Sequence, residues 1–177
     1  MSRFYNQGGV MANEEDWVML EEPEPTERER MFAEAHKTAT ERVQQFEERV
    51  LTVIRAHLGA EQALNALMKA GRRRRKNRSF SGKWWMAKGL YVEEMTEELW
   101  EVLKVGNELR NAIAHGDKPG LIEAKVVELR KAFIDANTPQ QKMYIMEMTE
   151  KQMITMAFSH CASHMVVAAD RLEREGR

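Results

Sequence analysis

The sequence predicts an all-α helical bundle with two long helices and several short ones. Apolar residues recur at helical spacing along most of the 177-residue chain, and no segment alternates as a half-buried strand does. Only 4 Pro and 10 Gly interrupt these patterns, and the 13 Met favour helices and fill irregular cores. The chain is long enough for one domain with a hydrophobic core.

The first 25 residues are predicted to form a flexible acidic arm, followed by a single domain over 26–177. Gly8, Gly9, Pro23 and Pro25 break any helical period in the arm. Thr26-Glu27-Arg28-Glu29 matches a capping box, which predicts that a long helix starts there. Its apolar residues recur at a spacing near 3.5 in one continuous stripe. These residues are Phe32, Ala39, Val43, Phe46, Val50 and Val53.

Gly59 is expected to end this helix, so residues 61–70 are predicted to form a second, short one. Its inward residues are expected to be Leu64, Leu67 and Met68. Residues 71–82 are predicted to be a basic loop, and residues 83–90 a short helix or turn. A fourth helix is expected to start near Val92 and to end at Gly116. Its apolar stripe comprises Val92, Met95, Leu99, Val102, Leu109 and Ile113.

Two further helices complete the prediction. Residues 121–136 are predicted to form the fifth, and Thr138-Pro139 opens the last, which is expected to run to about Glu173. The residues expected to face inward on the last helix are Met143, Met146, Met153, Met156, Val166 and Val167.

Charge is distributed unevenly although the net charge is only −1. Residues 12–35 carry 9 acidic and 2 basic side chains, whereas residues 69–88 carry 9 basic and no acidic ones. Cations interleaved with aromatic rings suit a phosphate backbone and unstacked bases. The candidate RNA-binding residues are Arg72, Arg73, Arg74, Arg75, Lys76, Arg78 and Lys83. The alternatives are a solvated loop, or a basic patch covered by the acidic arm.

The segment from Asn107 to Asp117 carries the most specific chemical signal. It combines Arg110, Asn111 and His115 near the expected end of a helix. A permanent cation can bind a phosphate, an amide can orient it, and an imidazole can move a proton near neutral pH. Five residues of regular helix place Arg110 and His115 about 140° apart around the axis. Either the helix frays at His115, or Arg110 of one chain meets His115 of another.

This segment resembles the signature of the HEPN family (higher eukaryote and prokaryote nucleotide-binding domains). In that signature an arginine, here Arg110, precedes a polar residue, here Asn111, and a histidine, here His115, closes it at the shortest spacing. The specific likeness covers residues 107–117, and the helical context extends it over residues 27–175. The resemblance implies a small helical domain that forms a homodimer, in which two facing motifs build one composite cleft.

The resemblance also implies a function. The expected activity is that of a metal-independent endoribonuclease of the toxin or antiviral-defence type, with no cofactor, acting in a microbial or phage setting. The ribose 2′-OH attacks the adjacent phosphorus and leaves a 2′,3′-cyclic phosphate and a 5′-OH. Arg110, Asn111 and His115 are then the catalytic residues. RNA, a second copy and an inhibitory, antitoxin-like protein are the implied partners.

Two other functions remain open from the sequence. One is a non-catalytic HEPN-like module for regulation, dimerisation or binding of nucleotides or nucleic acids, and the other is a purely structural interaction protein. His160 and His164 have metal-ligand spacing, but no second ligand pair accompanies them, so no metal site is predicted. The single Cys161 and the polar first nine residues indicate a cytoplasmic protein, and no segment predicts a membrane span.

Overall fold

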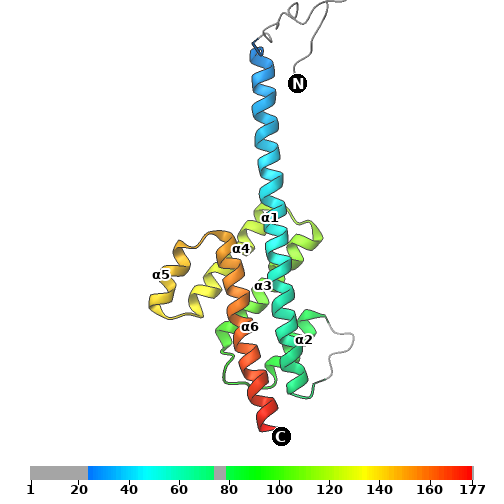
Figure 1. Cartoon of the computed structure of the whole chain (residues 1–177), viewed down its shortest axis with the longest axis vertical. Coiled ribbons are helices and arrows are strands. Elements are labelled where there is room, and N and C mark those ends of the chain that lie inside the picture. Colours follow the sequence, from blue (N-terminus) through cyan, green and yellow to red (C-terminus); the bar gives the residue numbers. More distant parts are fainter. Residues whose placement is uncertain (1–23, 74–78, 177) are drawn as a thin grey trace, which may run out of the picture. The chain divides into compact units, whose positions relative to one another are not determined.

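The computed structural model describes residues 24–73 and 79–176, and every regular element in these ranges is a helix, as predicted (Figure 1). The helices are α1 (Glu27–Ala70), α2 (Phe80–Lys88), α3 (Glu97–His115), α4 (Pro119–Asp135), α5 (Pro139–Glu147) and α6 (Glu150–Glu175). α1 and α6 are the two long helices. None of the described helices is long and apolar enough to cross a membrane.

The chain divides into two structural units between Val43 and Gln44. The described part of the first unit begins with the predicted capping box. The Thr26 backbone N–H donates to Glu29 Oε2 at 2.8 Å, and the Glu29 N–H donates to Thr26 Oγ1 at 3.3 Å. These bonds satisfy two amides of the first helical turn, which explains why α1 starts there. Every residue from 24 to 43 is exposed.

The second unit, residues 44–176, is a helical bundle in which α1 and α6 lie side by side (Figure 1). Arg49 of α1 donates to both carboxylate oxygens of Glu150 in α6, from Nε at 2.5 Å and from Nη2 at 2.9 Å. The core of the bundle is built from α3, which packs against α2, α4 and α6. All six residues of the predicted stripe from Val92 to Ile113 are buried, which confirms the period assigned to this segment.

The crossing of α3 and α6 is especially close at Gly106. A Cβ atom at this position would lie 2.6 Å from Cζ of Phe158, which is 1% exposed. Only glycine leaves room for the ring. This contact fixes the height of α3 along α6, and with it the position of the last turns of α3.

The predicted stop at Gly59 is wrong, because α1 continues through it to Ala70. Residues 61–70 are therefore the end of α1 and not a separate helix. Glycine inside a helix costs about 1 kcal/mol relative to alanine. The complete burial of Leu64, Leu67 and Met68 in the same helix outweighs that cost.

The predicted single last helix is also wrong, since α5 and α6 are separated at Met148 and Thr149. Met148 is extended, with ψ at 139°. The guanidinium of Arg130 in α4 donates to the carbonyl oxygens of Ile145 at 2.5 Å and Met148 at 2.9 Å. A new capping box then starts α6, with the Thr149 N–H donating to Gln152 Oε1 at 3.0 Å. Arg130 of α4 therefore caps the end of α5, and the capping box of Thr149 starts α6, so the chain forms two helices instead of one.

Other boundaries and faces differ in detail. α2 begins at Phe80, inside the predicted loop, and α3 begins at Glu97, where Thr96 is the N-cap, not near Val92. Of the residues expected to face inward on the last helix, Met153 is buried. The others are exposed: Met143, Met146, Met156, Val166 and Val167. Met143 and Met146 belong to the separate helix α5, and Val166 and Val167 line an open groove between α1 and α6.

Candidate functional site

The C-terminal end of α3 carries the motif, and it is a closed, regular helix end. Gly116 adopts the left-handed conformation, with φ at 69°. Its N–H donates to Ile113 O at 3.1 Å, and the Asp117 N–H donates to Ala112 O at 2.9 Å. This pair of bonds is the Schellman motif, which satisfies the last carbonyl groups of the helix. α3 therefore stays helical through His115, and the fraying considered for His115 is not observed.

The three motif side chains occupy different parts of this helix end. Arg110 is half-buried and donates from Nη1 to Asn111 Oδ1 at 3.2 Å. His115 is exposed in the last turn and makes no hydrogen bond to Arg110 or Asn111 within the described chain. One chain thus couples the cation to the amide, while the imidazole has no direct hydrogen bond to either.

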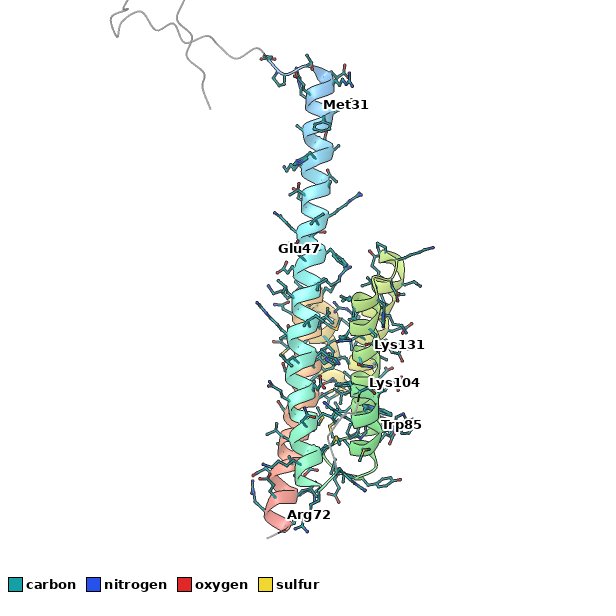
Figure 2. All side chains as sticks on the ribbon, turned by 90° about the vertical axis from the view of Figure 1, so that its right-hand side faces the viewer. Met31, Glu47, Arg72, Trp85, Lys104 and Lys131 are labelled. Atoms are coloured by element: carbon teal, nitrogen blue, oxygen red, sulfur yellow. The ribbon has the colours of Figure 1, made fainter. Side chains whose placement is uncertain are left out.

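A groove of about 420 Å³ runs between α2 and α3 and reaches Asn111. Trp85 is 69% exposed, and it lines the groove together with Lys104 (Figure 2). The complete lining is Phe80, Ser81, Trp84, Trp85, Glu101, Lys104, Asn107, Glu108 and Asn111. It combines an aromatic surface with amides and a cation, which is a set of side chains able to contact a base and a phosphate.

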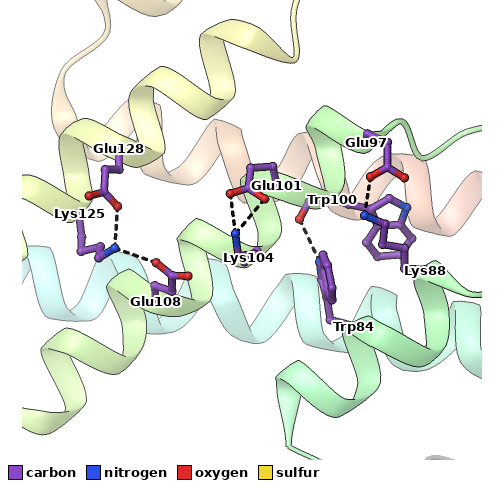
Figure 3. A network of polar contacts seen from close by, with 9 residues as sticks. All are labelled: Trp84, Lys88, Glu97, Trp100, Glu101, Lys104, Glu108, Lys125 and Glu128. Atoms are coloured by element: carbon purple, nitrogen blue, oxygen red, sulfur yellow. Dashed lines mark hydrogen bonds and ion pairs between the residues drawn. The ribbon is translucent and has the colours of Figure 1, made fainter.

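The adjacent tryptophans Trp84 and Trp85 have different surroundings. Trp84 is buried and donates from Nε1 to the carbonyl oxygen of Trp100 at 2.9 Å (Figure 3). The Lys88 ammonium lies 5.1 Å from the centre of its ring and pairs with Glu97. Trp84 therefore holds α2 on α3. The exposure of Trp85 does not agree with a packing role.

A buried polar cluster lies behind this groove. His57 Nε2 in α1 donates to Asn107 Oδ1 at 3.2 Å, and Asn107 Nδ2 donates to Ser81 Oγ at 3.4 Å. The His57 ring also packs on Phe80, with 4.4 Å between ring centres. Burial lowers the pKa of His57, and the nearby cations of Arg110 and Lys83 lower this pKa further, while the bond to Asn107 opposes the shift. His57 is thus held neutral close to Arg110.

Ion pairs join several carboxylates of α3 to nearby lysines (Figure 3). Lys125 Nζ lies 2.7 Å from Glu108 Oε2 and 2.6 Å from Glu128 Oε2. Lys104 Nζ lies 2.8 Å from Glu101 Oε1. Each acid on the rim of the groove thus has a cationic partner, but Lys125 is shared by two carboxylates, so the pairs reduce the negative charge of the rim without removing it.

The candidate RNA-binding residues are only partly described. Arg74, Arg75, Lys76 and Arg78 lie outside the described residues, as does the acidic arm through residue 23. Arg72 and Arg73 are exposed directly after α1, and Arg72 Nη2 donates to the carbonyl oxygen of Gly176 at 3.4 Å. Lys83 pairs with Glu61, with Nζ 2.5 Å from Oε1, and its side chain is only 12% exposed.

The remaining histidines and the cysteine have structural surroundings. His164 Nδ1 lies 2.7 Å from the carbonyl oxygen of Glu94, and the rings of His160 and His164 are 4.7 Å apart. Cys161 is fully buried, and burial raises the pKa of its thiol to about 12. In residues 24–73 and 79–176 there is no group of three or more His, Cys, Asp or Glu placed to hold a metal ion.

Asn107 and His57 were not among the predicted site residues. One signal was available: Asn107 and Asn111 are four residues apart, so they share a helix face with Lys104. That spacing indicates a polar face of the helix beside the motif. Nothing comparable marks His57, since its partner is 50 residues away.

Comparison with known proteins adds no relative to these observations. No family model, no curated protein and no solved structure matches the chain.

Proposed function

We propose that this protein is a metal-independent endoribonuclease. The observation that carries the proposal is the end of α3, where Arg110 and Asn111 are coupled at 3.2 Å and His115 lies exposed in the final turn. This supports the function expected from the resemblance of residues 107–117 to the HEPN signature. Toxin or defence activity, and restraint by an inhibitory partner, belong to the same proposal.

The proposed site is composite, formed by two copies of the chain. Within one chain, the regular helix keeps His115 apart from Arg110. A two-fold pair of α3 ends would bring Arg110 and Asn111 of one copy to His115 of the other. The two sites of such a dimer are equivalent.

The reaction follows from the chemistry of these groups. The ribose 2′-oxygen forms a bond to phosphorus, and the bond from phosphorus to the 5′-oxygen breaks. His115 accepts the 2′-OH proton or supplies a proton to the leaving oxygen. Arg110 stabilises the charge on the non-bridging oxygens, while Asn111 orients the phosphate. DNA lacks the 2′-OH and would not be cleaved.

A second candidate function, a non-catalytic module that binds nucleotides or nucleic acids, is favoured by a different observation. The groove between α2 and α3 presents the exposed face of Trp85 next to Lys104 and Asn111. Stacking on an aromatic side chain contributes about 1–3 kcal/mol per base. Such binding needs no contribution from His115.

One experiment separates the two candidates. The full chain is incubated with total RNA in EDTA, alongside Arg110→Ala, His115→Ala and the control Arg55→Ala, which removes an exposed arginine of α1. The proposal expects cyclic-phosphate ends from the wild type and from Arg55→Ala, and none from the two motif variants. RNA that is bound but left intact by a folded, dimeric wild type would support the binding module instead.

A further inference from the structure

α1 contains a regular heptad repeat. Only the side chains in the C-terminal half of this repeat are buried by the bundle. Apolar or histidine side chains alternate at intervals of three and four residues along the helix. In the bundle these positions are buried, and they are Val53, His57, Ala60, Leu64 and Leu67. Toward the N-terminus the same repeat continues through Phe32, His36, Ala39, Val43, Phe46 and Val50. We call these last six residues the N-terminal stripe.

Within the described part of the chain, the N-terminal stripe is exposed from Phe32 to Phe46, and Val50 at its end is half-buried against the core. Phe32 is 74% exposed, Val43 57% and Phe46 43%. A stripe that repeats every 3.5 residues is typical of a helix that packs along another helix. Scattered exposed apolar residues need no explanation, but a periodic row over three heptads does.

A helix that stands alone in water needs stabilising side-chain pairs on its surface. Among the described residues, the only ion pair formed by residues 27–47 joins Arg30 to Glu24, at 3.9 Å and with both side chains well exposed. Such a pair contributes little. The charges of this segment therefore do not explain its stability, and burial of the N-terminal stripe against a partner helix would.

The charged positions beside the stripe identify a parallel partner of the same sequence. The a positions of the repeat are His36, Val43 and Val50, and the d positions are Phe32, Ala39 and Phe46. The g positions that follow from this assignment are Arg28, Ala35, Arg42 and Arg49. The e positions include Glu47. In a parallel pair of identical helices, a g residue faces the e residue five positions later in the partner, so Arg42 meets Glu47. Antiparallel pairing would instead place g positions opposite g positions, where Arg28 and Arg42 would face like charges, since Arg49 is already paired with Glu150.

The a positions agree with this choice. A β-branched residue such as Val43 is typical of the a position in two-stranded parallel coiled coils, and a single polar a residue, here His36, fixes the register at some cost in stability. We propose that α1 forms a parallel, two-stranded coiled coil with a second copy of this chain through the N-terminal stripe. This dimer contact is separate from the proposed ribonuclease site and holds whether or not RNA is cleaved.

Substitutions in the full chain test the contact. Light scattering over a range of concentrations should give twice the 20.6 kDa of one chain. Val43→Glu places a charge in the stripe and should raise the dissociation constant of the dimer by about tenfold or more. Thr38→Glu adds the same charge outside the a, d, e and g positions and should leave it unchanged. Circular dichroism verifies that both variants keep their helices.

The orientation is tested through Arg42 and Glu47. Arg42→Glu and Glu47→Arg should each weaken the dimer, and the double variant should restore it because the pair is only reversed. Cysteine crosslinking gives an independent result, since the only native cysteine, Cys161, is buried. Ala39→Cys and Val43→Cys should each form a disulfide-linked dimer in the parallel pair.

Three results would overturn the proposal. The first is a monomer at every concentration. The second is a dimer that Val43→Glu does not weaken, which would place the contact on another face, such as the groove between α1 and α6 lined by Leu51, Phe158 and Val167. The third is crosslinking at only one of positions 39 and 43. In an antiparallel pair only one position faces itself, and the other sulfurs would be about 12 Å apart along the axis, too far for a disulfide.

Discussion

The side chains of His57 and Asn107 form a buried hydrogen bond of 3.2 Å that joins α1 to α3. Asn107 lies one turn before Arg110, and its amide also donates to Ser81. Through these two hydrogen bonds, Asn107 connects α3, the helix that carries the motif, to α1 and to α2. The strength of the bond between His57 and Asn107, and the protonation of His57, affect the stability of the fold and the position of the candidate site.

The unfolding free energy should decrease as the pH falls below neutrality, in part because of His57. Burial lowers the pKa of His57 in the folded state, so below about pH 6.5 the unfolded chain binds a proton that the folded chain does not. The contribution of His57 is complete above the unfolded pKa and is lost as the pH falls toward the folded pKa. Denaturant unfolding between pH 7.5 and about pH 5 measures this slope, which is at most about 1.4 kcal/mol per pH unit for one proton.

The matched variant is His57→Gln, which keeps a donor near Asn107 but does not titrate. Its stability should depend less steeply on pH than that of the wild type. His160, whose pKa burial also lowers, remains in both proteins and contributes an equal background. Identical slopes for the two proteins would show that His57 is not a buried neutral histidine.

Asn107→Ala should destabilise the fold more than Asn111→Ala. The first substitution leaves the buried Nε2–H of His57 without an acceptor, at a cost of about 1–3 kcal/mol. Asn111 is only half-buried and accepts a hydrogen bond from Arg110. Water can replace Asn111 as the acceptor for the guanidinium of Arg110. Urea unfolding of both variants measures the difference, and equal losses would contradict the role assigned to the bond between His57 and Asn107.

Two glycine substitutions should change stability in opposite directions. Gly106→Ala places a Cβ 2.6 Å from Phe158 Cζ, and such overpacking costs about 1–3 kcal/mol. Gly59→Ala adds a methyl group with no atom within 4 Å and should stabilise α1 by about 0.5–1 kcal/mol. Thermal and urea unfolding compare them. A neutral Gly106→Ala would mean that the ring of Phe158 moves aside without loss of packing.

Mixing inactive variants tests whether the proposed site is composite. If Arg110 of one copy acts with His115 of the other, a heterodimer of Arg110→Ala and His115→Ala contains one intact site. Random pairing should then restore about a quarter of the wild-type ribonuclease activity after the two proteins are unfolded and refolded together. Activity that stays at the level of the separate variants would place both residues of each site in one chain.

Part of the candidate site was predictable from the sequence. The helical period predicts that a regular helix places Arg110 and His115 about 140° apart around its axis, and α3 is regular through His115. The groove beside Asn111 was not predictable. It depends on how α2 packs against α3, which involves the exposed ring of Trp85 and the bond from Trp84 to Trp100.

The sequence by itself determined the helical class and those helix ends that depend on neighbouring residues. The capping box of Thr26 and the left-handed turn at Gly116 each involve residues three to five positions apart. Tertiary structure decided the remaining helix ends and polar contacts, because the residues that stabilise them are distant in the sequence. Arg130 ends α5 from another helix, burial of Leu64 carries α1 through Gly59, and Asn107 receives its partner from α1.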